Sequence, residues 1–360
     1  MTEQPLDRPP SDQEGRVAFE RLAEGFRQAC LKSPLVERTY RMAGRQIVLR
    51  VAGPRLATMI GRPLVHLRTT DADATPELTI DLWDEAETGV FSDGCVLGSD
   101  PEAPGSIIIH DRARYVRHIS PSVSTVMDRK ASHLVGWVGS GDRLTQYELG
   151  RPLHSELLMW HRDRGIQAVH AGLVSDGTGG VLFGGPGGSG KTTTALTSLR
   201  GGLAYLADDY VGLEQAADGT WIGHSLYCSS HLTPDHIQRF PDLIPHAIPG
   251  RLAREDKSLV LLGELYPNGF APSTPIRAVV LPRVAGTPNT TIRPASKVDV
   301  LRQLAPSSLF QLPYGLSGRR SFDTMVGLVE SVPTWWIDLG LDLDEIPMTI
   351  RKILNMGTAT

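Results

Sequence analysis

A glycine-rich stretch in the middle of the chain, VLFGGPGGSGKTTTAL (Val181 to Leu196), contains the residues whose types and spacing point most clearly to chemistry. Gly185, Gly190, Lys191 and Thr192 match the pattern G-x-x-x-x-G-K-[ST]. Glycines let a backbone curl so that successive N–H groups point at phosphate oxygens, and the positive end of the following helix points there too. In such a loop Lys191 reaches the β- and γ-phosphates of a nucleotide and the Thr192 hydroxyl binds Mg²⁺. The predicted phosphate-binding residues are Gly185, Gly187, Gly188, Ser189, Gly190, Lys191, Thr192 and Thr193.

The residues around this loop have the context that such a motif requires. GGVLFGG before it predicts a short strand, and TTTALTSLRGG after it predicts a helix that stops at a Gly–Gly pair. A strand, a glycine loop and a helix in that order favour nucleotide binding over a plain flexible turn.

Two adjacent carboxylates follow the predicted helix. Tyr205 to Ala207 is predicted as a buried strand that delivers Asp208 and Asp209 to its carboxyl end, the edge of an open α/β sheet where ligands bind. One carboxylate can hold Mg²⁺, and we assign this to Asp208. The other can take the proton from an attacking hydroxyl, and we assign this to Asp209. The alternative is that both are solvated residues at a turn.

A histidine precedes the loop. QAVHAGLVSDGTGGVLFGG reads as a β-hairpin with its turn at Asp176 to Gly179, so that Ser175 lies opposite Gly180. Continuing that register places His170 opposite Gly185, beside the phosphates. We therefore include His170 with Asp209 and Lys191 as predicted catalytic residues, although a strand histidine is often only packed.

These residues resemble a known family. The segment from Val169 to Val211 resembles the catalytic core of HPr kinase/phosphorylase-type serine kinases, which share a fold with ATP-dependent phosphoenolpyruvate carboxykinases. In that family a histidine precedes the loop and an aspartate pair ends the next strand; Asp209 matches the base that deprotonates the acceptor serine. Thr192 replaces the family's usual serine at the Mg²⁺ position. The resemblance extends more weakly to the divergent kinases of peptide-modification gene clusters, including those that phosphorylate lasso-peptide precursors.

The sequence departs from the family in two places. No RGLG-type segment, which carries a Mg²⁺-binding glutamate and is tied to phosphorolysis, is recognisable; WIGHSLYCSSHLTP stands roughly where it is expected. The N-terminal region does not match the N-terminal domain of HPr kinases. The resemblance therefore implies neither the reverse reaction nor HPr as the substrate.

The elements that must position these residues fall into two regions. A helix over 16–31 and the short strand-like segments RQIVLRVAG, LTIDLWD, GSIIIHD, RYVRHIS and SHLVGWVG predict a small N-terminal domain. A helix over 152–165 leads into the second region. We predict an α/β fold with a disordered tail over 1–14, an N-terminal α+β domain over 15–150 for substrate recognition, and a C-terminal HPr kinase/PEP carboxykinase-like P-loop domain over 151–360.

The composition indicates which kinds of partner and which cellular compartment to expect. A net charge of −4 gives no electrostatic reason to expect nucleic acid or an anionic membrane. No apolar run approaches the ~18 residues of a membrane span. Cys30, Cys95 and Cys228 are odd in number and lack CxxC spacing, which favours a reducing cytoplasm.

Taken together, the sequence predicts an ATP- and Mg²⁺-dependent O-kinase that acts on a Ser or Thr hydroxyl of a peptide or protein, such as a ribosomal-peptide precursor. The alternatives are a kinase of a small hydroxylated metabolite and a P-loop ATPase or switch that acts on a partner without phosphorylating it. Two sets of basic residues are weaker candidates for contacts to the transferring phosphoryl group. They are Arg251, Arg254 and Lys257 in one segment, and Arg283 after a buried strand. His231 and His236 are interpreted as ordinary polar positions. Assembly into a homo-oligomer is left open.

Overall fold

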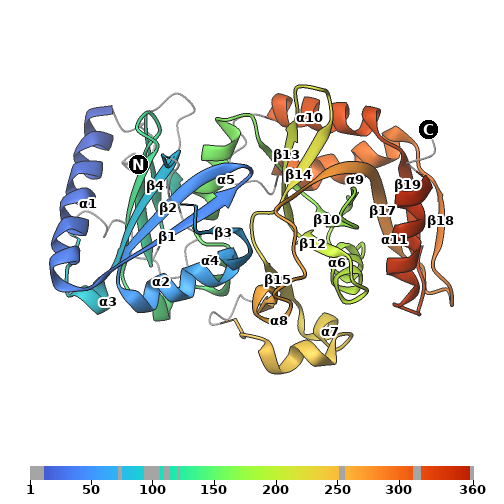
Figure 1. The fold of residues 1–360 in the computed structure, drawn as a ribbon, viewed down its shortest axis with the longest axis horizontal. Helices are drawn as coiled ribbons and strands as arrows, with labels where there is room; N and C mark the ends of the chain where they lie inside the picture. The colour runs from blue at the N-terminus through green and yellow to red at the C-terminus, as the bar shows by residue number, and fades with distance from the viewer. Residues whose placement is uncertain are drawn as a thin grey trace, which may run out of the picture. The chain divides into compact units, whose positions relative to one another are not determined.

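The computed structural model describes residues 12–71, 75–92, 106–108, 114–120, 122–250, 256–310 and 318–356, with the side chains of 106–108 and 310 left out. The fold is mixed α/β, as the sequence predicts. The chain forms two compact units. Figure 1 labels many of their helices and strands. The first contains the described residues up to Arg62 and Leu67–Glu156. The second contains Pro63–His66, Leu157–Gly250 and the described residues after Gly250.

The units change between Glu156 and Leu157, inside helix α5 (His154–Arg162), whereas the sequence analysis placed the boundary after Gly150. The short segment Pro63–His66 also belongs to the second unit, which no sequence pattern indicated.

The first unit is an eight-stranded sheet in the order β3-β1-β2-β4-β8-β7-β6-β5, within the described residues. Its strands are β1 (Leu35–Met42), β2 (Arg45–Ala52), β3 (Arg68–Thr69), β4 (Leu78–Asp84), β5 (Ser106–Ile108), β6 (Tyr115–Ile119), β7 (Val123–Asp128) and β8 (His133–Val138). β2, β4 and β8 are parallel neighbours, and the other pairs are antiparallel. The short helices of this unit are α2 (Pro54–Gly61), α3 (Glu85–Thr88) and α4 (Gln146–Gly150).

Helix α1 (Asp12–Lys32) covers one face of this sheet (Figure 1). It buries Leu22, Phe26 and Ala29 against a core that includes Trp83 and Val126. The sequence analysis assigned residues 12–14 to a disordered tail, but they belong to the helix. Two physical reasons account for this: acidic residues in the first turn complement the helix dipole, and Gly15 packs directly on Tyr115. The predicted tail before Asp12 lies outside the described residues.

The second unit is built on a nine-stranded sheet, again within the described residues. Seven strands run in the order β12-β10-β11-β17-β14-β13-β9, and β19 pairs with β17 and in turn with β18. Its strands are β9 (Gln167–His170), β10 (Gly172–Ser175), β11 (Gly180–Phe183), β12 (Ala204–Ala207), β13 (Tyr210–Gln215), β14 (Trp221–His224), β17 (Ser273–Val284), β18 (Thr291–Pro294) and β19 (Thr334–Leu339). A separate two-stranded sheet joins β15 (Ser229–Leu232) to β16 (Ser258–Leu261).

The long strand β17 organises this unit. Its first residues pair with β14 and its later residues run parallel to both β11 and β19. Successive residues point to opposite faces, so Val280 enters a core shared with α6 and α11 whereas Leu281 enters a core shared with α9 and α10. The helices are α6 (Lys191–Arg200), α7 (Pro234–Ile237), α8 (Leu262–Leu265), α9 (Lys297–Phe310), α10 (Gly318–Ser331) and α11 (Glu345–Met356).

Candidate functional site

The glycine-rich loop (Gly184–Gly190) connects β11 to α6, as the sequence predicts. Gly185, Gly188 and Gly190 have φ values of 144°, 79° and 108°, a region that favours glycine. These conformations let the loop turn sharply before the first turn of α6. The arrangement therefore places backbone N–H groups and a helix N-terminus next to one another.

Both ends of this loop are packed against the sheet. A side chain at Gly190 would collide with Leu339 at the end of β19, and Pro282 of β17 is also close. At the other end, Gly184 lies against Leu281 of β17 and Leu304 of α9. The loop is thus held by strands β17 and β19, not only by the strand and helix that it connects.

Lys191 is buried at the start of α6. Its Nζ donates to the carbonyl oxygens of Gly185 (2.7 Å) and Pro186 (3.1 Å), which folds the side chain back over the loop. Burial lowers the pKa of the Lys191 amine, and the carboxylates of Asp209 and Asp208 partly oppose that shift. The amine therefore lies close enough to both carboxylates for their negative charges to act on it.

The hydroxyl groups around the loop differ in their partners. Thr193 Oγ1 lies 2.8 Å from Nε2 of His236, whereas Thr192 beside it is half-buried. Ser189 Oγ is buried and has no hydrogen-bond partner among the described residues. A buried hydroxyl without a partner is costly, which is consistent with a position that a ligand completes.

The two carboxylates after β12 have different environments. Asp208 is buried, and Ser230 Oγ donates to its Oδ2 at 2.5 Å. Asp209 has a side chain that is 34% exposed, and its Oδ1 lies 2.7 Å from His170 Nε2. Tyr205 is fully buried, and burial together with Asp208 raises the pKa of its hydroxyl well above the usual value. One carboxylate is therefore inside the protein and the other is accessible.

His170 lies in the site by a route that the sequence analysis did not predict. The β10–β11 hairpin has the predicted register, with Ser175 opposite Gly180, but its ladder ends at Gly172 and Phe183. Beyond these residues each arm finds another partner, because the Ala171 N–H donates to Asp209 O and the Gly184 N–H donates to Val280 O. The predicted pairing of His170 with Gly185 is wrong.

Strand β9 pairs with β13 instead, and His170 lies opposite Tyr210. Its backbone N–H donates to Ser308 Oγ of α9 at 3.1 Å, which anchors the strand. This pairing brings the imidazole to Asp209, the residue that precedes Tyr210. The ring Nδ1 is buried without a hydrogen-bond partner among the described residues.

Sequence reasoning missed two residues of this site. Ser230, on β15, contacts Asp208, and His236, on α7, contacts Thr193. His236 had been interpreted as an ordinary polar residue, yet burial lowers its pKa and Arg239 and Lys257 lower it further. No local motif marks either position. A long-range contact with the glycine-rich loop or with the strand end identifies them.

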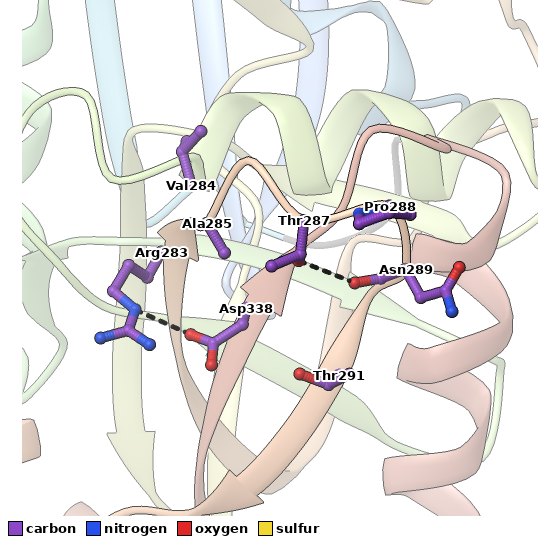
Figure 2. Close-up of a pocket in the computed structure, with 8 residues that line it drawn as sticks. All are labelled: Arg283, Val284, Ala285, Thr287, Pro288, Asn289, Thr291 and Asp338. Atoms are coloured by element: carbon purple, nitrogen blue, oxygen red, sulfur yellow. Dashed lines mark hydrogen bonds and ion pairs between the residues drawn. The ribbon is translucent and has the colours of Figure 1, made fainter.

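The basic residues that the sequence analysis gave as weaker candidates have different positions in the structure. Arg283 does not join the Asp209 cluster, because its Nε donates to Asp338 Oδ1 at 2.8 Å (Figure 2). Lys257 contributes slightly to the lowered pKa of Lys191. Arg251 and Arg254 lie outside the described residues.

The described part of the chain contains no group of three or more His, Cys, Asp and Glu side chains arranged to hold a metal ion. A magnesium site in a nucleotide-binding protein commonly uses only one or two carboxylates, and substrate phosphates and waters supply the other ligands. Thr192 and Asp208 are protein oxygens of the kind that such a site needs.

No protein-family model matches this sequence, and a search of curated proteins finds no match either. Among the described residues, no helix is both long and apolar enough to cross a membrane. The resemblance to HPr kinase-type enzymes therefore stays a prediction.

Proposed function

We propose that the protein transfers the γ-phosphoryl group of ATP to a Ser or Thr hydroxyl of a peptide or protein. The observation that carries this proposal is the pair formed by Asp209 and His170, which lies close enough to Lys191 of the glycine-rich loop for its charge to act on that amine. A phosphate-binding loop alone fits many activities. An accessible carboxylate paired with an imidazole beside it favours transfer to a hydroxyl.

We further propose that the second unit is a P-loop catalytic domain of the HPr kinase/PEP carboxykinase type. The strand–loop–helix arrangement and the left-handed glycines support this assignment. The buried Ser189 hydroxyl without a partner supports the presence of a ligand at the loop. The composition of the chain and its odd number of cysteines without CxxC spacing support a cytoplasmic enzyme.

The residues fit a magnesium–nucleotide complex. The backbone of the loop and the Lys191 amine would hold phosphate oxygens, and Thr192 with Asp208 would hold Mg²⁺. The ion, when bound, neutralises negative charge on the phosphates. Ser230 fixes the orientation of Asp208 through its hydrogen bond, and His236 fixes the hydroxyl of Thr193.

Asp209 is the base in this proposal. As the acceptor oxygen bonds to the γ-phosphorus, the bond from that phosphorus to the leaving oxygen breaks and the hydroxyl proton passes to a carboxylate oxygen of Asp209. His170 holds this carboxylate through Nε2 and is itself anchored by Ser308. In switch proteins the attacking water is commonly oriented by a glutamine, so the Asp–His pair favours a hydroxyl acceptor over water.

The test is to incubate the protein with Mg²⁺ and γ-labelled ATP and to present three acceptor classes separately: an array of Ser- and Thr-containing peptides, a set of hydroxylated metabolites, and water alone. We expect label on peptides, and we expect Asp209→Asn to lower transfer by about 10²- to 10⁴-fold while ATP binding is unchanged. Asp218→Asn is the matched control, because it makes the same substitution at an exposed loop residue of the same unit.

Three results would contradict the proposal. Label released only as inorganic phosphate indicates an ATPase or switch. Label found only on free metabolites indicates a small-molecule kinase. Equal transfer by Asp209→Asn and the parent protein removes Asp209 from the role of base.

A further inference from the structure

A short segment of the N-terminal region is part of the second unit. Pro63–His66 lie in the 3₁₀ helix η1 (Arg62–Leu67), and they belong to the second unit although the chain on either side of them belongs to the first. The Pro63 carbonyl oxygen accepts from the Cys228 N–H at 2.8 Å and from the Cys228 thiol at 3.2 Å. The segment is therefore anchored to the unit that contains the glycine-rich loop.

His66 ends this segment with a buried imidazole. Its Nε2 lies 2.8 Å from Ser225 Oγ, and Ser225 Oγ donates to the carbonyl oxygen of Leu206 at 2.6 Å. A hydroxyl has one proton to donate, and this one goes to the carbonyl, so Ser225 accepts from His66. His66 is therefore the tautomer with its proton on Nε2. Its Nδ1 is buried and has no hydrogen-bond partner among the described residues, as a bare lone pair requires.

The carbonyl at the end of this hydrogen-bond chain belongs to a β-bulge. The register of β10 with β12 shifts between Leu173 and Val174, so that Leu206 has no residue opposite it. An extra residue of this kind bends its strand and changes the direction in which the following side chains point. Asp208 and Asp209 come just after it, so the geometry of the bulge sets where the two carboxylates lie.

Aromatic packing connects His66 to the same strand. The ring of His66 lies 5.4 Å from the ring of Phe270, and Phe270 lies 5.6 Å from the ring of Tyr205 in an edge-to-face arrangement. The Tyr205 N–H donates to Gly269 O, and the Ala271 N–H donates to Tyr205 O. His66 therefore supports β12 through Phe270 as well as through the hydrogen-bond chain.

We propose that His66 is a positioning residue for phosphoryl transfer. It donates to Ser225, which holds the Leu206 carbonyl and so fixes the bulge. The bulge directs Asp208 toward Mg²⁺ and Asp209 toward the acceptor hydroxyl. The inference rests on the proposed function, and it gives part of the N-terminal region a role in the geometry of the transfer site.

Two substitutions of His66 separate its N–H group from its ring. His66→Phe keeps a ring against Phe270 but has no donor for Ser225. His66→Gln has no ring, but its side-chain amide can donate from about the position of Nε2. At saturating Mg²⁺, His66→Phe should lower kcat by about 10- to 100-fold with little change in the KM for ATP, as expected when reacting groups are displaced. His66→Gln should keep most of the parent's kcat.

Ser225→Ala breaks the same chain at its middle. It should lower kcat as much as His66→Phe does, and the double variant should lose no more than either single variant, because the two side chains act as one chain. Urea unfolding gives the folded fraction of each variant, so that kcat is expressed per folded molecule. A merely structural role for His66 would change the stability and leave this kcat unchanged.

Cys228→Ala is the matched control, because it removes a buried contact to Pro63 of the same segment without touching the chain. It should lower the urea midpoint and keep the kcat per folded molecule.

Asp209→Asn, measured in the same series, separates the inference from the proposed function. If the parent protein transfers label and Asp209→Asn does not, the proposed function stands. A kcat per folded molecule equal to the parent's in His66→Phe and Ser225→Ala then overturns the inference alone. Additive losses in the double variant would overturn it too, since the two side chains would act separately. If the parent protein transfers no label, the proposed function fails and the inference fails with it.

Discussion

The two units of this protein use buried charge in different ways. In the first unit, Asp81 accepts from Arg50 and His133, and Glu156 is bonded to His118 and Thr125. In the second unit, buried polar groups around the glycine-rich loop include Ser189 Oγ and His170 Nδ1, which lack partners among the described residues. Buried polar atoms without a partner occur in the first unit too, Glu156 Oε2 among them, so the difference lies in their position. In the second unit two of them lie at the glycine-rich loop and beside Asp209, where a ligand would complete them under the proposed function.

The pKa shifts reflect this contrast. Burial alone raises the pKa of Asp81, but the hydrogen bonds from His133 and Arg50 outweigh it and hold the pKa below its usual value. Burial lowers the pKa of Lys191, and the nearby carboxylates do not fully restore it. An ionised group with a matched partner stabilises the folded state. A group whose buried charge is only partly compensated by its neighbours is available for chemistry.

The largest expected effect on stability is in the first unit. Glu156→Gln removes the charge of a fully buried carboxylate that pairs with His118 at 2.9 Å. We expect a loss of about 3 kcal/mol in the free energy of unfolding, because His118 keeps no ionic partner at this position. Urea unfolding measures it. Glu77→Gln, whose side chain is half exposed, should cost less than about 0.5 kcal/mol.

Equal stability of Glu156→Gln and the parent protein would mean that the buried pair does not support the first unit. The proposed contrast between the two units would then be lost.

An intermediate effect concerns pH, and here one histidine in each unit contributes to stability with the opposite sign. Burial lowers the pKa of His66 in the second unit to about 3. Because the unfolded chain takes up this proton near pH 6.5 and the folded chain does not, stability falls on acidification, by about 2 kcal/mol between pH 6.5 and 5. His66→Gln should remove this part of the pH dependence, whereas His236, whose pKa is also lowered, keeps its own.

His118 in the first unit has the opposite sign. Burial lowers its pKa, but Glu156 outweighs burial and the net pKa is raised. Its contribution is therefore fully present below pH 6.5 and is lost as the pH rises through the folded pKa. Urea titrations of the parent, His66→Gln and His118→Gln between pH 5 and 8 separate the two; the same slope in all three would contradict the assignment.

The smallest expected effect concerns Ser230, which has both a structural contact and a proposed role in positioning Asp208. Ser230→Ala removes the hydrogen bond to the buried carboxylate of Asp208, which should cost about 1 to 2 kcal/mol of stability. It should also weaken Mg²⁺ binding by about tenfold, because Asp208 loses its fixed orientation. Ser258→Ala in the neighbouring strand β16 is the control. A loss of stability with unchanged Mg²⁺ binding would place Asp208 among the structural carboxylates.

Local patterns in the sequence predict much of the candidate site. The glycine-rich loop, the helix after it and the aspartates after β12 follow from residues that are close in the chain. The hairpin register is correct as far as Gly172 and Phe183, because its turn at Asp176 to Gly179 fixes it. Both parts of the candidate site, the loop and the aspartate pair, could therefore be located before the fold was known.

What the sequence did not predict depends on pairings between distant segments. His170 reaches Asp209 because β9 pairs with β13, a choice that no local pattern makes. Ser230 and His236 enter the site through β15 and α7. In the first unit, the periodicity predicts β4 and β8 but not β1 or β7, and it cannot give the parallel order of β2, β4 and β8. Tertiary packing decides these features.

One crossed measurement tests the central claim most directly: the stability and the phosphoryl transfer of two matched variants, Asp81→Asn in the first unit and Asp209→Asn in the second. Asp209→Asn should unfold at the same urea concentration as the parent protein and lose transfer by about 10²-fold or more. Asp81→Asn should unfold at lower urea and keep its transfer rate per folded molecule. If Asp209→Asn keeps its transfer rate, or if the two variants lose stability and transfer alike, the division between a structural first unit and a catalytic second unit is wrong.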